Sequence, residues 1–232
     1  MSNPDAWGTL YIVATPIGNL EDLTFRALRI LKEVSYIGCE DTRKTSKLLH
    51  HYDISQKRLL ACHRHNERAS AQGIIKLLEA GHDVAYCSDS GTPGISDPGA
   101  RLVESVLLAG GQVHPIPGVS ALATLFSVMG TNDETLLFAG FLPQRGQKRT
   151  KRLQELLTMQ SAILLYESPY RAENLLKELA ELAPDRHLIV GREMTKLYEE
   201  FWRGSAQSLA HERIGTPFIG EFALIITYNH KC

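Results

Sequence analysis

Short apolar runs alternate with segments of helical periodicity through the first half of the chain. Apolar residues recur every three or four positions between the runs, as at Ala27, Ile30 and Val34, and this spacing predicts helices. The runs themselves predict buried strands at 9–14, 35–40, 58–63, 83–88 and 112–117. Because repeated strand–helix units form parallel sheets covered by helices, we predict an α/β domain with a parallel sheet.

The second half of the chain has a different rhythm. A helix is expected at 170–182, and strands, some of them in closer succession, are expected at 161–168, 186–193, 198–204 and 220–228. This order predicts a smaller, mixed sheet. The composition changes near Pro143, which predicts a linker there. We therefore expect an N-terminal α/β domain over residues 1–142 and a C-terminal α/β domain over residues 143–232.

Composition excludes several classes of protein. Apolar residues make up 44% of the 232 positions, enough for a sizeable core, and no apolar run approaches the roughly 18 residues that span a bilayer. The start, MSNPDAWG, lacks the pattern of a secretory signal, so we expect a cytoplasmic protein. The four cysteines form no CxxC pair and no cluster with histidine. We expect reduced core thiols and no metal.

The net charge of −1 does not indicate a nucleic-acid-binding protein, so binding RNA would require a local basic patch. One basic segment is present, formed by Arg145, Lys148, Arg149, Lys151 and Arg152. Charge alone favours a solvated linker and helix start as the explanation of this segment.

Candidate chemistry lies in the loops that follow the predicted strands, because ligands of open parallel sheets bind outside the carboxyl ends of the strands. The loop SDSGTPGISDPG contains Gly91, Gly94 and Gly99, which allow a close backbone approach to a small ligand. Asp97 in this loop is as well suited to capping the next helix as to contacting a ligand. The chain contains no GxGxxG, GxxxxGK[ST], HExxH or GxSxG motif, which disfavours NAD-binding, P-loop, zinc-protease and serine-hydrolase chemistry.

Several of these loops resemble the tetrapyrrole methylases. VATPIGNLEDLTFRAL is similar to their first loop, SGTPGISD to their second glycine-rich loop and PGVSA to their third. CEDTR, HNE, YESPYR and REMTKLYEE resemble one branch of that superfamily, which methylates a ribose 2′-hydroxyl in small-subunit ribosomal RNA. The likeness runs from about Leu10 to GEFALIITY, and the joint order and spacing of the motifs make it specific.

The resemblance implies a cleft between the two domains that binds S-adenosylmethionine. By motif, the cofactor-binding residues would be Ile17, Asp89, Ser90, Gly91, Thr92, Ile95, Ser120, Ala121, Glu167 and Met194. Many relatives have aspartate in a GDP sequence where this chain has Thr92. A backbone contact to the cofactor would survive that difference, whereas a carboxylate contact would not.

The same branch implies methyl transfer to a cytidine in the decoding region. A ribose hydroxyl needs a general base, and the sequence does not identify which residue it is. The catalytic candidates are Glu40, Asp41, Arg43, Glu167, Arg171 and Lys196. The RNA-binding candidates are Arg43, His65, Asn66, Arg145, Lys148 and Arg149. In the simpler structural interpretation, Glu167 and Arg171 form a salt bridge one helical turn apart, and Lys196 pairs with Glu199 or Glu200 at the surface.

Three other functions share the expected fold. They are methylation of a small tetrapyrrole, methylation of a modified protein residue as in diphthamide synthesis, and RNA binding without catalysis. CEDTR, HNE and the basic segment argue against a tetrapyrrole substrate, and the intact cofactor loops argue against loss of catalysis. The resemblance also implies a homodimer. Members of this branch commonly continue past the GEF strand into a short helical region. This chain ends at NHKC, so either it lacks that region or it is truncated. If the region helps to grip RNA, we expect binding here to be weaker or to depend more on the basic segment.

Overall fold

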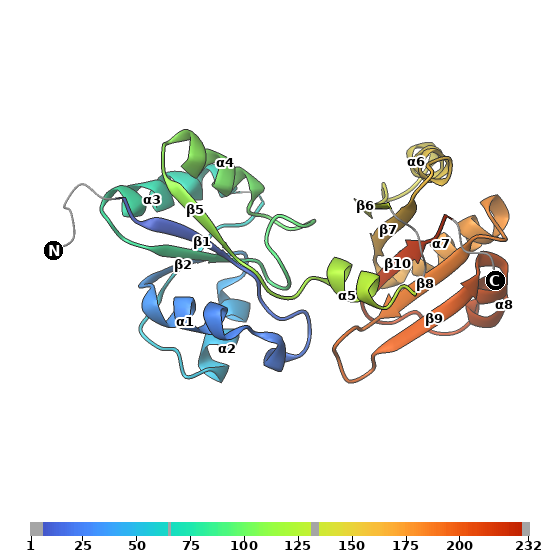
Figure 1. The fold of residues 1–232 in the computed structure, drawn as a ribbon, viewed down its shortest axis with the longest axis horizontal. Coiled ribbons are helices and arrows are strands. Elements are labelled where there is room, and N and C mark those ends of the chain that lie inside the picture. Colours follow the sequence, from blue (N-terminus) through green and yellow to red (C-terminus); the bar gives the residue numbers. More distant parts are fainter. Residues whose placement is uncertain (1–6, 65, 131–134, 229–232) are drawn as a thin grey trace. The chain divides into compact units, whose positions relative to one another are not determined.

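The chain forms two compact units, Met1–Ser120 and Ala121–Cys232 (Figure 1). A computed structural model describes residues 7–64, 66–130 and 135–228. The boundary that we expected near residue 143 lies inside the second unit, between a strand and a helix of that unit.

In the described residues, the first unit contains a five-stranded sheet in which all neighbouring strands are parallel, as predicted. Its order is β3-β2-β4-β1-β5. The strands are β1 (Thr9–Val13), β2 (Tyr36–Cys39), β3 (Arg58–Ala61), β4 (Val84–Cys87) and β5 (Gln112–Ile116). The order in which the strands are added switches direction at β1, which has β4 on one side and β5 on the other. Because neighbouring strands are parallel, the loops that follow them lie at one edge of the sheet.

Helices cover both faces of this sheet (Figure 1). They are α1 (Phe25–Glu33), α2 (Thr42–His51), α3 (Glu67–Glu79) and α4 (Ala100–Leu108), with a 3-10 turn η1 at Leu20–Asp22. Strand β4 shows why both faces are apolar: Ala85 and Cys87 pack with α1 and α2, whereas Val84 and Tyr86 pack with α3 and α4. Cys39, Cys62 and Cys87 are buried free thiols, as predicted.

A buried carboxylate from α3 holds the start of α4. Glu67 Oε1 accepts hydrogen bonds from the backbone N–H groups of Gly99, Arg101 and Leu102, at 2.9, 3.0 and 3.2 Å. Gly99 is the N-cap residue and supplies no side chain, so Asp97 is not the cap. A negative charge at a helix N-terminus satisfies unpaired N–H groups and interacts favourably with the helix dipole. Glu67 thus connects the loop after β3 with the glycine-rich loop after β4.

The second unit contains a mixed sheet, as predicted. Strands β6 and β7 are parallel, and the other neighbouring pairs in the order β6-β7-β10-β8-β9 are antiparallel. The strands are β6 (Leu136–Phe141), β7 (Ala162–Glu167), β8 (His187–Arg192), β9 (Glu200–Ser205) and β10 (Phe222–Ile226).

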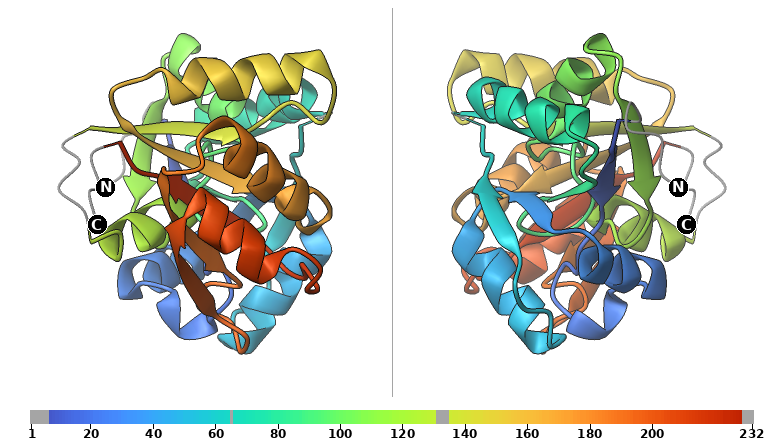
Figure 2. Two further views of the ribbon diagram at one scale, coloured as in Figure 1. Left: turned by 90° about the vertical axis from the view of Figure 1, so that its right-hand side faces the viewer. Right: turned by 90° about the vertical axis from the view of Figure 1, so that its left-hand side faces the viewer.

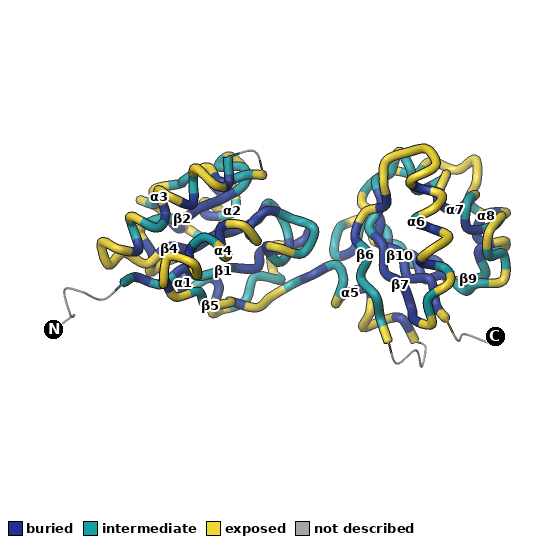
Figure 3. Tube along the Cα trace, turned by 90° about the horizontal axis from the view of Figure 1, so that it is seen from above, coloured by how far each residue is buried: buried dark blue, intermediate teal, exposed yellow. Residues whose placement is uncertain are grey.

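Three helices pack on one face of this second sheet, and their apolar residues form a single core with the strands. They are α6 (Gln147–Leu157), α7 (Pro169–Leu182) and α8 (Ala206–Arg213). Figure 2 (left) shows α7 and α8 crossing in front of the strands, and Figure 3 shows buried positions concentrated in the sheet. Helix α5 (Ala121–Ser127) packs against β8 and β10. Its Leu125 approaches Gly191, next to the Val190 that faces the three helices, so α5 lies on the opposite face.

Strand β6 and helix α8 were not expected from the sequence. In β6 the pairing register shifts between Phe138 and Gly140, where Gly140 has φ +64°, and this irregularity interrupts the apolar alternation. Pairing of Leu136 with Ala162 in β7 nevertheless makes β6 part of the second sheet. No described helix is both long and apolar enough to cross a membrane.

Candidate functional site

Three loops at the carboxyl edge of the first sheet are joined to one another by hydrogen bonds. Thr15, after β1, and Gly91, after β4, exchange two backbone hydrogen bonds of 2.9 and 3.0 Å. The Thr92 hydroxyl donates to the backbone carbonyl of Val119, after β5, at 3.0 Å. The structure thus brings together the loops that contain Ile17, Ser90, Gly91 and Thr92, which we expected to bind the cofactor.

Gly91 occupies a place that no side chain could share without displacing its neighbours. Its φ of +74° is left-handed, and a Cβ atom there would lie 3.3 Å from Ile17 Cγ2 and 3.8 Å from the Val119 carbonyl oxygen. Gly118 is similarly confined, since a Cβ would lie 3.0 Å from Ala14 Cβ. The three loops therefore approach each other closely through their backbone at these glycines.

A cavity of about 310 Å³ lies beside these loops, within the size range of small-molecule sites. It includes Ile17, Asp89 and Ser90 of the expected cofactor set. Its other lining residues are Thr15, Pro16, Gly18, Leu20, Lys44, Thr45, Lys47, Leu48 and Ser88. Lys44 and Lys47 were not identified from the sequence as lining residues. Their position after CEDTR is the signal that could have indicated them.

Three carboxylates meet at the ends of β2 and β4 in different electrostatic environments. Asp89 accepts from the Asp41 backbone N–H at 3.0 Å and pairs with Lys44 Nζ at 2.8 Å. Asp41 caps α2, and hydrogen bonds from the side chain and backbone of Arg43 hold its pKa well below the ordinary value. Burial raises the pKa of Glu40 above its ordinary value, and the nearby charge of Asp89 raises it further. The surroundings of Glu40 thus make this carboxylate more basic.

In the loop after β3, the Asn66 side chain forms hydrogen bonds with nearby backbone groups. Asn66 Oδ1 accepts from the His63 backbone N–H at 2.7 Å, and its Nδ2 donates to the Ala61 carbonyl at 3.0 Å. These bonds occupy the side chain that we expected to contact RNA. His65, the neighbouring candidate, lies outside the described residues.

In the second unit, Glu167 is held between two arginines. Arg149 Nη1 pairs with Glu167 Oε2 at 2.8 Å, and Arg171 Nη2 pairs with Glu167 Oε1 at 2.8 Å, as the structural interpretation of the i, i+4 spacing expected. Arg149 also reaches Glu178 at 2.9 Å. Glu167 Oε1 accepts a further bond from the Ser168 backbone N–H, so this carboxylate is fully engaged.

The position of Arg149 does not fit the phosphate contact at an exposed rim that we expected. Only 4% of the residue is exposed. The physical reason is the helical period: Arg149 lies on the same face of α6 as Leu153 and Leu156, which are completely buried. Charge along the sequence marked a basic segment but did not separate the buried face of the helix from its exposed face.

The REMTK segment forms a strained turn after β8. Glu193 and Thr195 have φ values of +49° and +68°, a conformation that is uncommon for residues other than glycine, and Met194 between them is buried. Lys196 pairs with Glu193 at 2.9 Å and with Glu221 at 3.0 Å, rather than with Glu199 or Glu200. Burial alone would lower the pKa of Lys196, but these two partners outweigh it and raise the pKa. A protonated Lys196 is unsuited to accept a proton.

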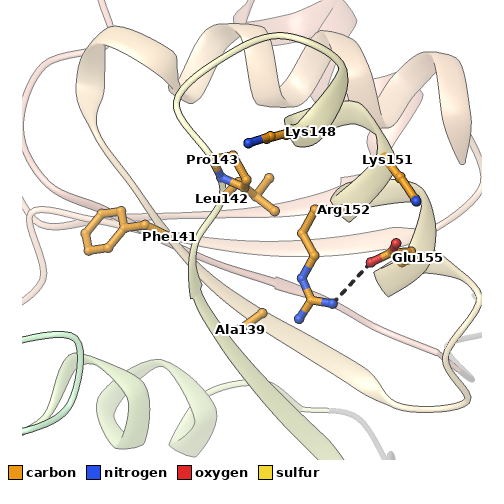
Figure 4. A pocket seen from close by; sticks show the side chains of 8 residues that line it. All are labelled: Ala139, Phe141, Leu142, Pro143, Lys148, Lys151, Arg152 and Glu155. Atoms are coloured by element: carbon orange, nitrogen blue, oxygen red, sulfur yellow. Dashed lines mark hydrogen bonds and ion pairs between the residues drawn. The ribbon is translucent and has the colours of Figure 1, made fainter.

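The exposed face of α6 lines a second hollow, of about 450 Å³, in the second unit (Figure 4). Lys148, Lys151 and Arg152 line it together with Ala139, Phe141, Leu142, Pro143 and Glu155. Arg145 is exposed but is not among the lining residues. Within the part of the chain that is described, no group of three or more His, Cys, Asp or Glu residues is arranged to hold a metal ion.

A profile of the tetrapyrrole (corrin/porphyrin) methylases matches residues 9–210. The chain belongs to this family. It is 44% identical over 225 residues to a ribosomal RNA small subunit methyltransferase I from Halalkalibacterium halodurans, covering 97% of this chain and 78% of the relative. The protein of the same name from Borrelia garinii subsp. bavariensis is 44% identical over 220 residues, covering 94% of this chain and 98% of the relative.

Solved structures agree on the tetrapyrrole-methylase fold. The chain matches a uroporphyrin-III-C-methyltransferase from Thermus thermophilus with a TM-score of 0.65 at 18% identity, covering 95% of this chain and 94% of the other. A cobalt precorrin-4 methyltransferase matches with a TM-score of 0.67 at 16% identity, covering 94% of both chains. At such low identity these two likenesses describe the fold alone.

The ion-pair network of the second unit predicts that Arg149 is structural. Arg149→Met should lower the free energy of unfolding by about 3–5 kcal/mol, because it leaves a buried carboxylate with one partner fewer. Arg171→Met should lower the free energy of unfolding by less, since each Glu167 oxygen would keep a partner: Arg149 on Oε2 and the Ser168 amide on Oε1. Urea denaturation monitored by circular dichroism measures both losses.

Lys177 is the matched control, since it pairs at the surface with Glu173 on α7. Lys177→Met should change the unfolding free energy by less than about 1 kcal/mol. An Arg149 variant as stable as the Lys177 variant would contradict the structural role.

Proposed function

We propose that this chain is an S-adenosylmethionine-dependent methyltransferase that methylates the ribose 2′-hydroxyl of a cytidine in the decoding region of small-subunit ribosomal RNA. The observation that carries the proposal is the 44% identity over 97% of the chain to a ribosomal RNA small subunit methyltransferase I. The joined loops of the first unit support it independently, because they form a cradle of backbone groups suited to a small ligand.

The residues fit S-adenosylmethionine. A Cβ at Gly91 would press against Ile17, so the loops can approach this closely with glycine at this position. Ser90, Gly91, Thr92 and Ile17 would hold the cofactor, which supplies a methyl group on a sulfonium. A uroporphyrin-III C-methyltransferase of the same fold was solved in complex with S-adenyl homocysteine. The participation of Ile95, Ser120, Ala121, Glu167 and Met194 remains a prediction, as does a cleft shared by the two units.

Thr92 replaces the aspartate that many relatives have, and its hydroxyl donates to Val119. The side chain thus ties two loops together and leaves the backbone to meet the cofactor. A contact through the backbone at this position is compatible with the difference in sequence.

We propose Glu40 as the general base. The acceptor hydroxyl must lose its proton as the carbon–oxygen bond forms, and a carboxylate with a raised pKa is a stronger base than an ordinary one. The other candidate bases are less suited. Asp41 is paired with Arg43, Glu167 is paired with two arginines, and Lys196 is protonated. Glu40 lies at the carboxyl end of β2, on the edge where the cofactor loops meet.

Arg43 is suited to a phosphate. Its side chain is 86% exposed and pairs with Asp41 at the surface, where a phosphate could reach the guanidinium. Arg171 is less accessible and serves Glu167 first. Arg145 and Lys148 remain proposed RNA contacts, whereas the buried Arg149 does not belong to that set. Homodimer formation and a cytoplasmic location also stay predictions.

Tetrapyrrole and diphthine-type protein methylation are the alternatives. The solved tetrapyrrole enzymes are only 16–18% identical to this chain, whereas the ribosomal RNA methyltransferases are 44% identical over nearly its whole length. The comparisons therefore favour RNA as the substrate.

Substitution of Gly91 tests the cofactor cradle. Gly91→Val should abolish binding of S-adenosylmethionine in isothermal titration calorimetry, because the added side chain would occupy the space between the three loops. Gly110 is the matched control: its φ is +88° and a Cβ atom there would have no neighbour within 4 Å, so Gly110→Val carries similar backbone strain away from the loops. Unchanged affinity in a folded Gly91→Val protein would refute the cradle.

The substrate is tested with small ribosomal subunits from cells that lack this methylation. Incubation with S-adenosylmethionine labelled on its methyl group should place the label on one cytidine ribose, which makes the adjacent linkage resistant to alkali. Label on a base, on a ribosomal protein or on an added tetrapyrrole would overturn the proposed substrate and leave the family assignment in place.

Glu40→Gln tests the base. Turnover at saturating RNA should fall by about 100-fold or more. Because the pKa of Glu40 is raised, kcat/KM of the natural enzyme should fall as the pH decreases through a value above the ordinary carboxyl range. The variant should lose this acid limb of the pH profile. Glu33→Gln, on an exposed pair with Arg29, is the control. A Glu40→Gln enzyme with full turnover and an intact acid limb would exclude Glu40.

A further inference from the structure

Helix α6 presents two different basic faces. Arg149 lies on the buried face with Leu153 and Leu156, whereas Lys148, Lys151 and Arg152 line the hollow beside β6. The spacing of three and four residues places these three cations on one side of the helix. In Figure 4, Lys148 extends toward Pro143 and Arg152 toward Ala139, while Lys151 lies farther from β6.

The hollow has an excess of positive charge. Among its described lining residues the only carboxylate is Glu155, which pairs with Arg152 at 3.4 Å. Lys148 and Lys151 make no ion pair with any described residue. Two unpaired cations one helical turn apart repel each other, a cost that a bound anion would remove.

An exposed aromatic ring lies at the edge of the same hollow. Phe141 ends β6 and is 52% exposed, although it packs against Tyr166 with ring centroids 5.8 Å apart. Ala139, Leu142 and Pro143 provide the remaining apolar lining. Cations beside an accessible aromatic ring match single-stranded nucleic acid, whose phosphates need positive charge and whose unpaired bases stack on aromatic side chains.

We propose that this hollow binds one nucleotide of single-stranded RNA other than the one that is methylated. Lys148 and Lys151 contact its phosphate, and its base stacks on Phe141. This assignment rests on the proposed function, since it takes the substrate to be RNA. It gives a nearly neutral protein a local grip on unpaired RNA that duplex RNA, with its bases stacked inside, cannot use fully.

The test uses the full chain and a fluorescein-labelled single-stranded RNA hexanucleotide, with a duplex of the same sequence for comparison. Binding is followed by fluorescence anisotropy at several salt concentrations. Lys148→Gln and Lys151→Gln should each weaken binding and reduce the salt-dependence slope, and the double variant should reduce it by about 0.7, the value for one phosphate contact on a single strand. Lys177→Gln, which removes a paired cation on α7, should change neither.

The aromatic contact is tested separately. Phe141→Leu should weaken binding of the single strand by about fivefold or more, as expected for loss of one stacked base, with the salt slope unchanged. Phe141→Tyr keeps the ring and should bind like the natural protein. Duplex binding should respond to the lysines but not to Phe141→Leu.

Either of two results would overturn the assignment. The first is unchanged affinity of Phe141→Leu for the single strand, which would indicate a site for phosphate alone. The second is an unchanged salt slope in both lysine variants. Failure of the proposed function is a different result. If the natural protein binds the hexanucleotide as described but places no methyl group on small-subunit RNA, the hollow stands and the proposed reaction is wrong.

Discussion

The two hydrogen bonds between Thr15 and Gly91 tie the loop after β1 to the loop after β4. They form only because the parallel sheet places both strand ends at one edge and because Gly91 has no side chain in a position that Ile17 and Val119 border. The Thr92 hydroxyl then adds the loop after β5. Backbone geometry, rather than a set of reactive side chains, is thus what brings the predicted cofactor loops together.

Charge is distributed in a contrasting way in the second unit. There, Glu167 is buried with Arg149 and Arg171 on its two oxygens, so the same residue types that look catalytic in sequence are used to fix the end of β7 against α6 and α7. A buried carboxylate with both oxygens paired orders its surroundings and has little capacity left for proton transfer. The exposed lysines of α6, Lys148 and Lys151, take no part in this network.

Much of the fold could be predicted because most strands are short apolar runs bounded by turns, as in YIGC and FALII. Strand β6 was not predicted because its bulge at Gly140 breaks the alternation of apolar residues. The loops of the first unit could be predicted because they follow the predicted strands, and glycine and proline mark those after β1, β4 and β5. The orientation of Arg149 could not, because it depends on which face of α6 the core covers. The role of Glu67, the last residue of HNE, could not be predicted either, because it depends on three backbone amides of a distant loop.

That shared oxygen of Glu67 has a mechanical consequence. Because one atom holds three amides at the start of α4, the first residue of α3 and the end of the glycine-rich loop are fastened to each other at a single point. Asn66, which fastens the loop after β3 through its side chain, immediately precedes Glu67 in the chain. The acceptor that fixes the end of the glycine-rich loop therefore follows directly, in the chain, on the residue that fixes the loop after β3.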